Sequence, residues 1–188
     1  MAEEDWSGEF LLLQDRGVTL APGLTAGEFQ RAQEIHRFQF PPDLRSLLAC
    51  ALPVAPGFPD WRAPDSSTLL DHLARPFEGI AFDIKNNDFW YGPWGPRPAT
   101  LSDAIAVAKT AVETAPRLVP IYIHRYLPAE PDIAGNPVFS VHETDVIHYG
   151  VDLRRYLSCE FGRLDYVDAA RDEPRRIRFW TDLVEDNV

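Results

Sequence analysis

Three of the five histidines, His124, His142 and His148, lie in one short stretch rich in β-branched and aromatic residues. Imidazole nitrogens with nearby carboxylates are ligands that zinc and iron accept. On one continuous strand, His142 and His148 would point to the same side, because they are six positions apart. Glu143 and Asp145 are at odd offsets from His142 and would point to the opposite side. We therefore predict no metal, and keep a histidine-based metal enzyme as an alternative.

Other patterns that carry catalysis are missing from the sequence. Ser140 lies two residues before His142, but no Gly-x-Ser-x-Gly motif places it at a strand-to-helix turn. Neither Cys50 nor Cys159 has a neighbouring base or a second cysteine at ligand spacing, so we interpret both as buried, reduced thiols. The sequence also contains no P-loop and no glycine-rich dinucleotide motif. These observations favour a protein without catalysis and without a cofactor.

A proline-constrained loop over residues 86–98 is the most aromatic part of the chain. Tryptophan and tyrosine are over-represented at binding hot spots, and flanking carboxylates suit a basic partner. The candidate partner-binding residues are Asp83, Asp88, Trp90, Tyr91, Trp94 and, in a second aromatic loop, Trp61. The alternative is that these rings close the open end of a sheet and belong to the core.

The composition restricts the classes of partner. A chain of 188 residues is long enough for one domain with a sizeable core. Its formal net charge of −11 argues against direct binding to nucleic acid or to an anionic membrane, and would suit a basic protein. The acidity also serves solubility. The chain starts without a basic-then-apolar leader and contains no apolar run of membrane-spanning length, so we predict a cytoplasmic protein.

Signals for helix starts recur along the chain. Thr25 and Glu28 form a capping-box pattern, in which the hydroxyl accepts a hydrogen bond from a free helix N–H and the carboxylate reaches back. The predicted helices begin at or next to Thr25, Pro42, Ser66 or Ser67, Thr100, Asp152 and Pro174. We expect the third of these helices to end at Pro76, because proline removes a helical hydrogen bond.

Strand signals lie mainly between these helices. The segments predicted as strands are residues 80–84, 118–123, 138–142 and 145–149. Short corners rich in proline and glycine join the last three and favour antiparallel pairing. Helices and strands do not alternate regularly, so we predict an α+β fold with a small, mostly antiparallel central sheet flanked by N-terminal and C-terminal helices.

A series of short motifs carries a family resemblance. They are residues 24–29 (LTAGEF), 41–48 (PPDLRSLL), 53–61 (PVAPGFPDW), 89–90 (FW), 94–98 (WGPRP), 118–121 (LVPI), 124–128 (HRYLP), 135–141 (GNPVFSV) and 144–150 (TDVIHYG). In this order and spacing they resemble the SUKH superfamily, in its Smi–Knr-like branch. We expect an irregular segment at 1–23, in which residues 9–14 could form a short strand or a helical turn. A SUKH-like domain follows at 24–161, with a helical extension at 162–188 packed on that domain.

The resemblance implies an α+β domain of helices around a small sheet, with no catalysis and no cofactor. Bacterial members of the superfamily are typically immunity proteins that bind and neutralise a cognate toxin, often a nuclease, encoded beside them. Fungal relatives are cell-wall assembly regulators that act as scaffolds. The family has no shared catalytic residue to carry over. We therefore expect a toxin-binding immunity protein, with a regulatory scaffold for an endogenous protein as the alternative.

Overall fold

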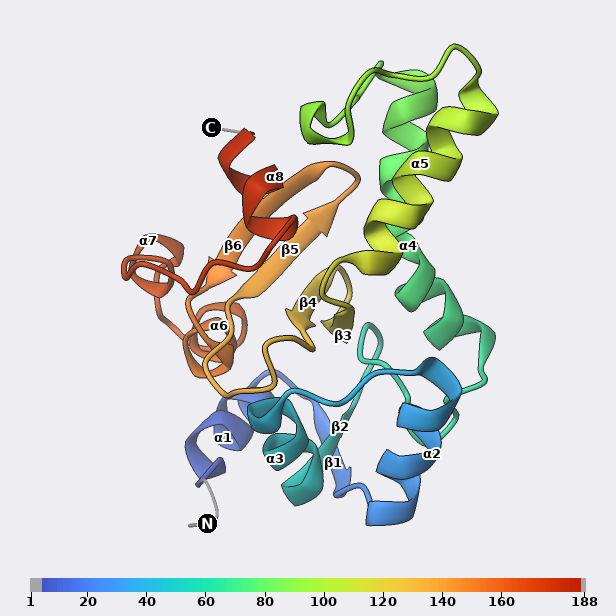
Figure 1. Cartoon of the computed structure of the whole chain (residues 1–188). Helices are drawn as coiled ribbons and strands as arrows, with labels where there is room; N and C mark the ends of the chain where they lie inside the picture. The colour runs from blue at the N-terminus through green and yellow to red at the C-terminus, as the bar shows by residue number, and fades with distance from the viewer. Residues whose placement is uncertain (1–4, 187–188) are drawn as a thin grey trace.

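The computed structural model describes residues 5–186, so residues 1–4 and 187–188 of the two predicted terminal segments lie outside the described part of the chain. The order of elements is shown in Figure 1. They are α1 (Ser7–Asp15), β1 (Thr19–Pro22), α2 (Ala26–His36), α3 (Pro42–Cys50), β2 (Ala51–Val54), α4 (Ser67–Asn86), η1 (Gly92–Trp94), α5 (Leu101–Thr114), β3 (Leu118–Tyr122), β4 (Arg125–Pro128), β5 (Val138–His142), β6 (Asp145–Gly150), α6 (Leu153–Glu160), α7 (Tyr166–Ala169) and α8 (Trp180–Asp186).

The central sheet has four antiparallel strands in the order β3-β4-β5-β6, so each strand pairs with its neighbour along the chain. Tyr126 on β4 lies opposite Phe139 on β5, and Val141 on β5 lies opposite Val146 on β6. A second, two-stranded sheet joins β1 to β2. The predicted α+β fold with a small antiparallel sheet is confirmed.

Our sequence prediction missed β1, β2 and β4. Each has four residues and contains a proline, at Pro22, Pro53 and Pro128. Proline cannot donate a hydrogen bond to a ladder, so a short run that contains it resembles a loop in the sequence. In the structure β1 and β2 pair only with each other, and Pro128 is the last residue of β4.

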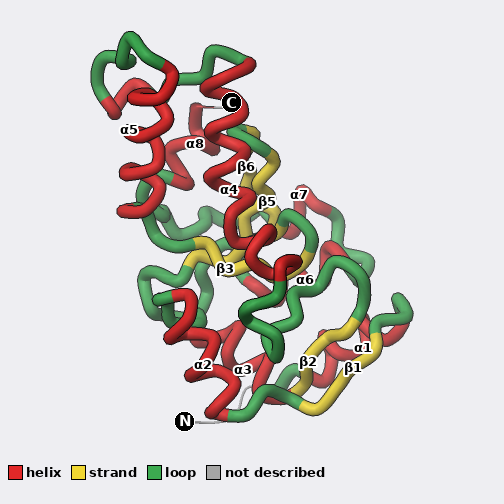
Figure 2. The backbone as a smooth tube through the Cα atoms, turned by 90° about the vertical axis from the view of Figure 1, so that its right-hand side faces the viewer, coloured by secondary structure: helices red, strands yellow, loops and turns green. Residues whose placement is uncertain are grey.

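Helices cover both faces of the central sheet. On one face the core involves α1, α2, α3 and α6, and its members include Phe29, Leu44, Trp61, Leu127 and Leu157. On the other face the core involves α4, α5 and α8, and its members include Ile80, Ala108, Tyr126, Phe139 and Trp180. Figures 1 and 2 show α1–α3 at one end of the molecule and the ends of α4 and α5 at the other. A strand covered on both faces is apolar at successive positions, which is the pattern of β3.

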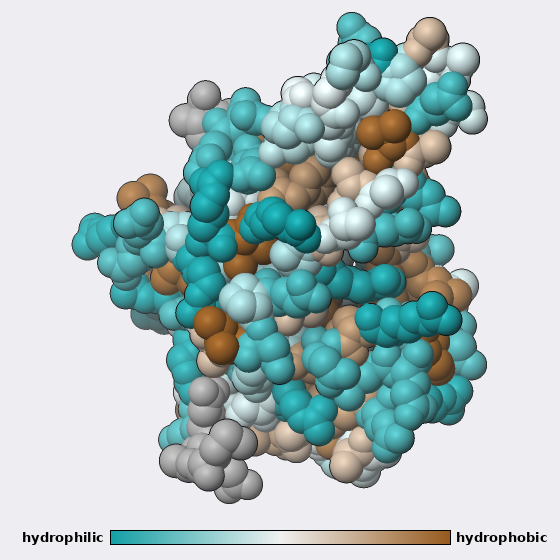
Figure 3. Space-filling model, viewed as in Figure 1, coloured by the Kyte–Doolittle hydropathy of each residue, from teal (hydrophilic) through white to brown (hydrophobic). Residues whose placement is uncertain are grey.

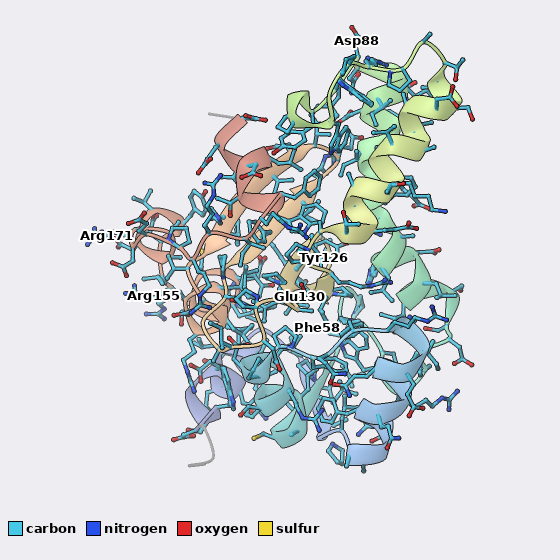
Figure 4. The ribbon with its side chains drawn as sticks, viewed as in Figure 1. Phe58, Asp88, Tyr126, Glu130, Arg155 and Arg171 are labelled. Atoms are coloured by element: carbon cyan, nitrogen blue, oxygen red, sulfur yellow. The ribbon has the colours of Figure 1, made fainter. Side chains whose placement is uncertain are left out.

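The longest helix, α4, corrects two predictions. It continues through Pro76, where we expected an end, and it contains residues 80–84, which we expected to be a strand. Because Pro76 has no N–H, the carbonyl of His72 lacks its helical donor. The hydroxyl of Tyr126 supplies that donor at 2.9 Å. Figure 4 shows Tyr126 in the middle of the molecule, where β4 meets the helices.

The N-terminal segment is not irregular as predicted, because it forms α1 and β1. Trp6 and Leu13 are buried in the core, and the indole nitrogen of Trp6 donates to the hydroxyl of Ser46 at 3.0 Å. The guanidinium of Arg154, from α6, lies 3.9 Å from the centroid of the Trp6 ring. These contacts join residues far apart in the sequence, and they stabilise a helix of nine residues where the sequence predicted only a short strand or a helical turn at residues 9–14.

The last helix begins at Trp180 and not at the predicted Pro174. The residues between them are held in a non-helical conformation by their arginines. Arg175 donates to the side-chain oxygen of Asn136 at 2.6 Å, and Arg178 donates to the carbonyl of Thr114. The C-terminal helix α8 is therefore shorter than the helix that the sequence predicted from Pro174. A further short helix, α7, precedes it.

Local signals placed several other helix starts correctly. The capping box of α2 is present: the N–H of Glu28 donates to the Thr25 hydroxyl, and the N–H of Thr25 donates to the Glu28 carboxylate at 2.7 Å. Asp152 caps α6 by accepting a hydrogen bond from the N–H of Arg155 at 2.7 Å, and Thr100 caps α5. These interactions lie within four residues, so sequence reasoning could find them.

Both cysteines are free, but neither is fully buried, so the predicted burial is wrong. Cys50 is exposed because it is the last residue of α3, off the stripe formed by Leu44, Leu47 and Leu48. Cys159 is half-buried on α6. Burial and the neighbouring Glu160 carboxylate raise the pKa of the Cys159 thiol.

The hydrogen bond from the Tyr126 hydroxyl to the His72 carbonyl predicts how much stability is lost when the hydroxyl oxygen of Tyr126 is removed. Tyr126→Phe leaves the buried carbonyl without a partner, so the free energy of unfolding should fall by about 1–3 kcal/mol, as measured by urea denaturation. Tyr122→Phe is the matched control, because its half-buried hydroxyl makes no hydrogen bond to any of residues 5–186, and it should change stability by less than about 0.5 kcal/mol. Equal effects of the two substitutions would contradict this account.

Candidate functional site

The three histidines do not converge on one point. His124 lies in the turn between β3 and β4, and its ring centroid is 6.3 Å from that of His142 at the end of β5. His148 lies on β6 against the ring of Phe139, with 5.0 Å between centroids. His142 and His148 do not share one continuous strand as the parity prediction assumed, because a turn at residues 143–144 separates β5 from β6. Within residues 5–186, no group of three or more His, Cys, Asp or Glu side chains is placed to hold a metal ion.

The aromatic loop, residues 87–98, joins α4 to α5 at the end of the molecule opposite α1–α3 (Figures 1 and 2). Asp88 lies at this outer end in Figure 4 and its side chain is almost fully exposed. The surface over η1 in Figure 3 is pale, between hydrophilic and hydrophobic, whereas much of the surrounding face is hydrophilic. The loop thus presents aromatic side chains within a polar surface.

Arg97 braces the aromatic loop against the end of α4. Its guanidinium donates to the carbonyl of Ile84 at 2.7 Å and to the carbonyl of Asp88 at 3.1 Å, and it pairs with the Asp88 carboxylate. The N–H of Phe89 also donates to the carbonyl of Asp83 at 3.2 Å. The loop is therefore ordered before any partner binds, which lowers the entropic cost of binding.

Trp94 lies at the centre of a cluster of rings. Its ring meets those of Phe89, Trp90 and Tyr91 edge to face, at centroid distances of 6.2, 5.2 and 5.4 Å. It stacks on Phe179 at 6.0 Å. Trp90 and Trp94 are half-buried, so each supports the loop and also exposes part of its ring. For these two residues the core interpretation holds for the packed part of each ring, and the binding interpretation stays a prediction for the exposed part.

Tyr91 is on the inner side of the loop. It is buried, and its hydroxyl donates to the Asp182 carboxylate on α8 at 2.9 Å. Burial and this hydrogen bond raise the pKa of the Tyr91 hydroxyl to about 12, so it stays protonated as the donor. Tyr91 therefore anchors the loop to α8 instead of facing a partner.

Asp83 and Trp61 are interior residues, which corrects their prediction as partner contacts. Asp83 is 4% exposed, and its carboxylate accepts from the N–H and hydroxyl of Thr144 at 2.9 and 2.6 Å. Trp61 is 1% exposed and packs edge to face against Phe40, with 4.8 Å between ring centroids. Their positions depend on contacts with distant segments that no local pattern shows.

The turn between β5 and β6 rests on α4 beside the aromatic loop. A Cβ atom at Gly79 would lie 2.6 Å from the Cα of Glu143, so only glycine allows this close approach. One turn further along α4, Asp83 holds Thr144. Between the turn and the loop is an open groove of about 390 Å³. It is lined by Asp83, Asn87, Phe89, His142, Glu143, Thr144 and Asp145.

The groove and the loop form one surface, which we call the acidic aromatic surface. It consists of Asp88, Phe89, Trp90, Trp94, Glu143 and Asp145. No lysine or arginine within residues 5–186 forms a salt bridge with Glu143 or Asp145. The sequence analysis named Asp88, Trp90 and Trp94 but missed Phe89, Glu143 and Asp145 as members, because the strand pairing that brings the turn to the loop is not local.

Comparison with known proteins yields no relative. No family model, no curated protein and no solved structure matches this chain. Among residues 5–186, no helix has the length and apolar character needed to cross a membrane.

The Asp83 carboxylate predicts a pH-dependent contribution to stability. Burial raises its pKa, but the hydrogen bonds from Thr144 and Asn87 outweigh burial, so the pKa lies below the ordinary value of 3.8. A lowered folded pKa stabilises the protein above the unfolded pKa, and this contribution is lost as the pH falls through the folded value. The stability advantage of the wild type over Asp83→Asn should therefore shrink as the pH falls from about 6 to about 2.

The measurement is chemical denaturation of both proteins across that pH range. Asp71→Asn, on the exposed side of α4, is the control and should give a profile nearly parallel to the wild type. A constant difference between wild type and Asp83→Asn at every pH would show that the charge of Asp83 plays no part in holding the turn.

Proposed function

We propose that this chain is a cytoplasmic, non-enzymatic protein-binding domain of the SUKH type that acts as an immunity protein, neutralising a cognate toxin encoded nearby. The observation that carries the proposal is the acidic aromatic surface: the exposed carboxylates of Asp88 and Asp145 and the half-buried Glu143 lie beside half-exposed indole rings, all supported by α4. The order and spacing of the motifs over residues 24–161 support the family assignment.

Charge favours a basic partner for this surface. The chain carries a formal net charge of −11, and Glu143 and Asp145 add unneutralised carboxylates to one groove. Nuclease toxins bind the phosphate backbone through lysine and arginine, so their substrate-binding surface is basic. Complementary charge speeds the encounter of two proteins and selects against wrong partners. An acidic groove is thus suited to cover the basic surface of a nuclease.

The aromatic part of the surface supplies the contact area. The indole nitrogen of Trp90 donates to the carbonyl of Gly95 at 2.7 Å, so its polar atom is satisfied before binding. A partner that covers Trp90 therefore removes apolar area from water without breaking a hydrogen bond from its indole nitrogen to the solvent. Tryptophan side chains in such settings are the commonest hot spots of protein interfaces.

The first test is rescue from the product of the adjacent gene. Expression of that product alone should arrest growth, and co-expression of this chain should restore it. The double substitution Glu143→Lys/Asp145→Lys should abolish rescue, because it reverses the charge of the groove. Asp15→Lys/Glu34→Lys changes the net charge by the same amount at the opposite end of the molecule and should still rescue.

Failure of the wild type to rescue, together with failure to co-purify the adjacent product, would reject the toxin as partner. Stable co-purification with a housekeeping protein would instead assign the scaffold function. Equal rescue by both double variants would place the binding surface elsewhere on the molecule.

A second prediction concerns Trp90. Trp90 is half-buried, so part of its ring is free to contact a partner. Trp90→Ala should therefore weaken binding of the purified partner by about 2 kcal/mol, roughly 30-fold, as measured by calorimetry. The melting temperature should fall by only a few degrees, about 2–4 °C. Trp94→Ala removes contacts with four rings, so it should lower both affinity and stability.

Leu11→Ala is the control for loss of exposed apolar area. Leu11 lies on α1, is 61% exposed, and is far from the aromatic loop, so its substitution should leave affinity unchanged. An equal loss of affinity for Trp90→Ala and Leu11→Ala would contradict a hot spot at Trp90.

A further inference from the structure

A separate cavity of about 200 Å³ lies between α4, α5, the start of β3 and α8. None of its lining residues belongs to the acidic aromatic surface. Figure 1 shows α4 and α5 side by side, with the chain between α5 and β3 leaving the lower end of α5 beside the middle of α4. The cavity therefore has walls from four elements that the tertiary fold brings together.

Apolar side chains form part of the cavity lining. Leu73 and Phe77 come from α4, Val112 from α5 and Trp180 from α8. The indole nitrogen of Trp180 already donates to the carbonyl of Pro116 at 2.7 Å, so this wall offers no free donor. Cavities of about 150 Å³ with such walls hold a single aromatic ring, and drug-sized ligands need about 300 Å³ or more. The cavity suits one ring or a short alkyl chain.

Arg117 is an exposed residue at the rim of the cavity. The guanidinium of Arg117 makes no hydrogen bond or ion pair with any of residues 5–186, whereas the nearby Arg178 donates to the carbonyl of Thr114. Arg117 is exposed as a whole residue, but partial burial of its guanidinium lowers its pKa, and the Glu113 carboxylate acts in the opposite direction. Lys109, also at the rim, is 3.9 Å from the Glu113 carboxylate. The rim thus has two cations and one anion.

We propose that this cavity binds a small organic monocarboxylate with an apolar body, such as a single ring or an alkyl chain of about eight carbons. The body fills the space between Leu73, Phe77 and Val112. The carboxylate accepts two parallel hydrogen bonds from the guanidinium of Arg117, whose planar geometry matches that of a carboxylate. Glu113 and the negative C-terminal end of α5 disfavour ligands of higher negative charge, such as phosphate monoesters.

The test is calorimetric titration of the full chain with octanoate, octan-1-ol, octylamine and octyl phosphate. Octanoate should bind most tightly, because only it combines the apolar body with a single negative charge. Arg117→Gln should weaken octanoate at least about tenfold and leave octan-1-ol unchanged. Arg163→Gln is the control. Arg163 is exposed, follows α6 in the sequence and does not line the cavity, so this variant should bind octanoate as the wild type does.

Val112→Phe fills the cavity and should weaken octanoate and octan-1-ol together, which separates loss of space from loss of charge. The proposal is overturned if folded wild type binds no octanoate up to about 5 mM, or if octylamine or octyl phosphate binds as tightly as octanoate. It is also overturned if Arg117→Gln retains wild-type affinity. Should Arg117→Gln fail to fold, Arg117→Lys keeps the charge without the fork and should still weaken octanoate. No outcome depends on the toxin partner.

Discussion

The hydrogen bond from the Tyr126 hydroxyl to the carbonyl of His72 is the interaction on which the rest of the structure depends. It occupies the carbonyl that Pro76 leaves without a donor, so α4 continues for another ten residues after the proline. Without that second half of the helix, neither the turn between β5 and β6 nor the aromatic loop would have its support.

The second half of α4 organises the candidate surface through two close contacts. Gly79 lets the backbone of Glu143 approach the helix, and the buried Asp83 carboxylate fixes Thr144 one turn later. The end of the same helix receives Arg97, which holds the aromatic loop. A turn and a loop that are 45 or more residues apart in the sequence therefore share one rigid base. This shared base is the physical reason for treating them as one surface.

The two faces of the central sheet differ in what their covering helices form. The face covered by α1, α2, α3 and α6 is a continuous core. The face covered by α4, α5 and α8 carries both the acidic aromatic surface and the cavity at Arg117. One is an open acidic groove suited to a basic protein, and the other a small apolar space with a basic rim. Their opposite charge preferences mean that one ligand would not serve both sites.

The sequence by itself determined the features that depend on neighbouring residues. The caps at Thr25 and Asp152 and the strands β5 and β6 follow from side-chain chemistry and burial patterns within a few positions, and so does the α+β class. The sequence also located the aromatic loop, with its exposed Asp88 and its half-buried Trp90 and Trp94. The tertiary structure alone decided the continuation of α4, the helical N-terminus, and the burial of Asp83 and Trp61. Each of these rests on partners at least 21 residues away that supply a donor, an acceptor or a packing surface, as Tyr126 does for His72 at a separation of 54. Only the folded chain brings such partners together, so local patterns could not reveal them.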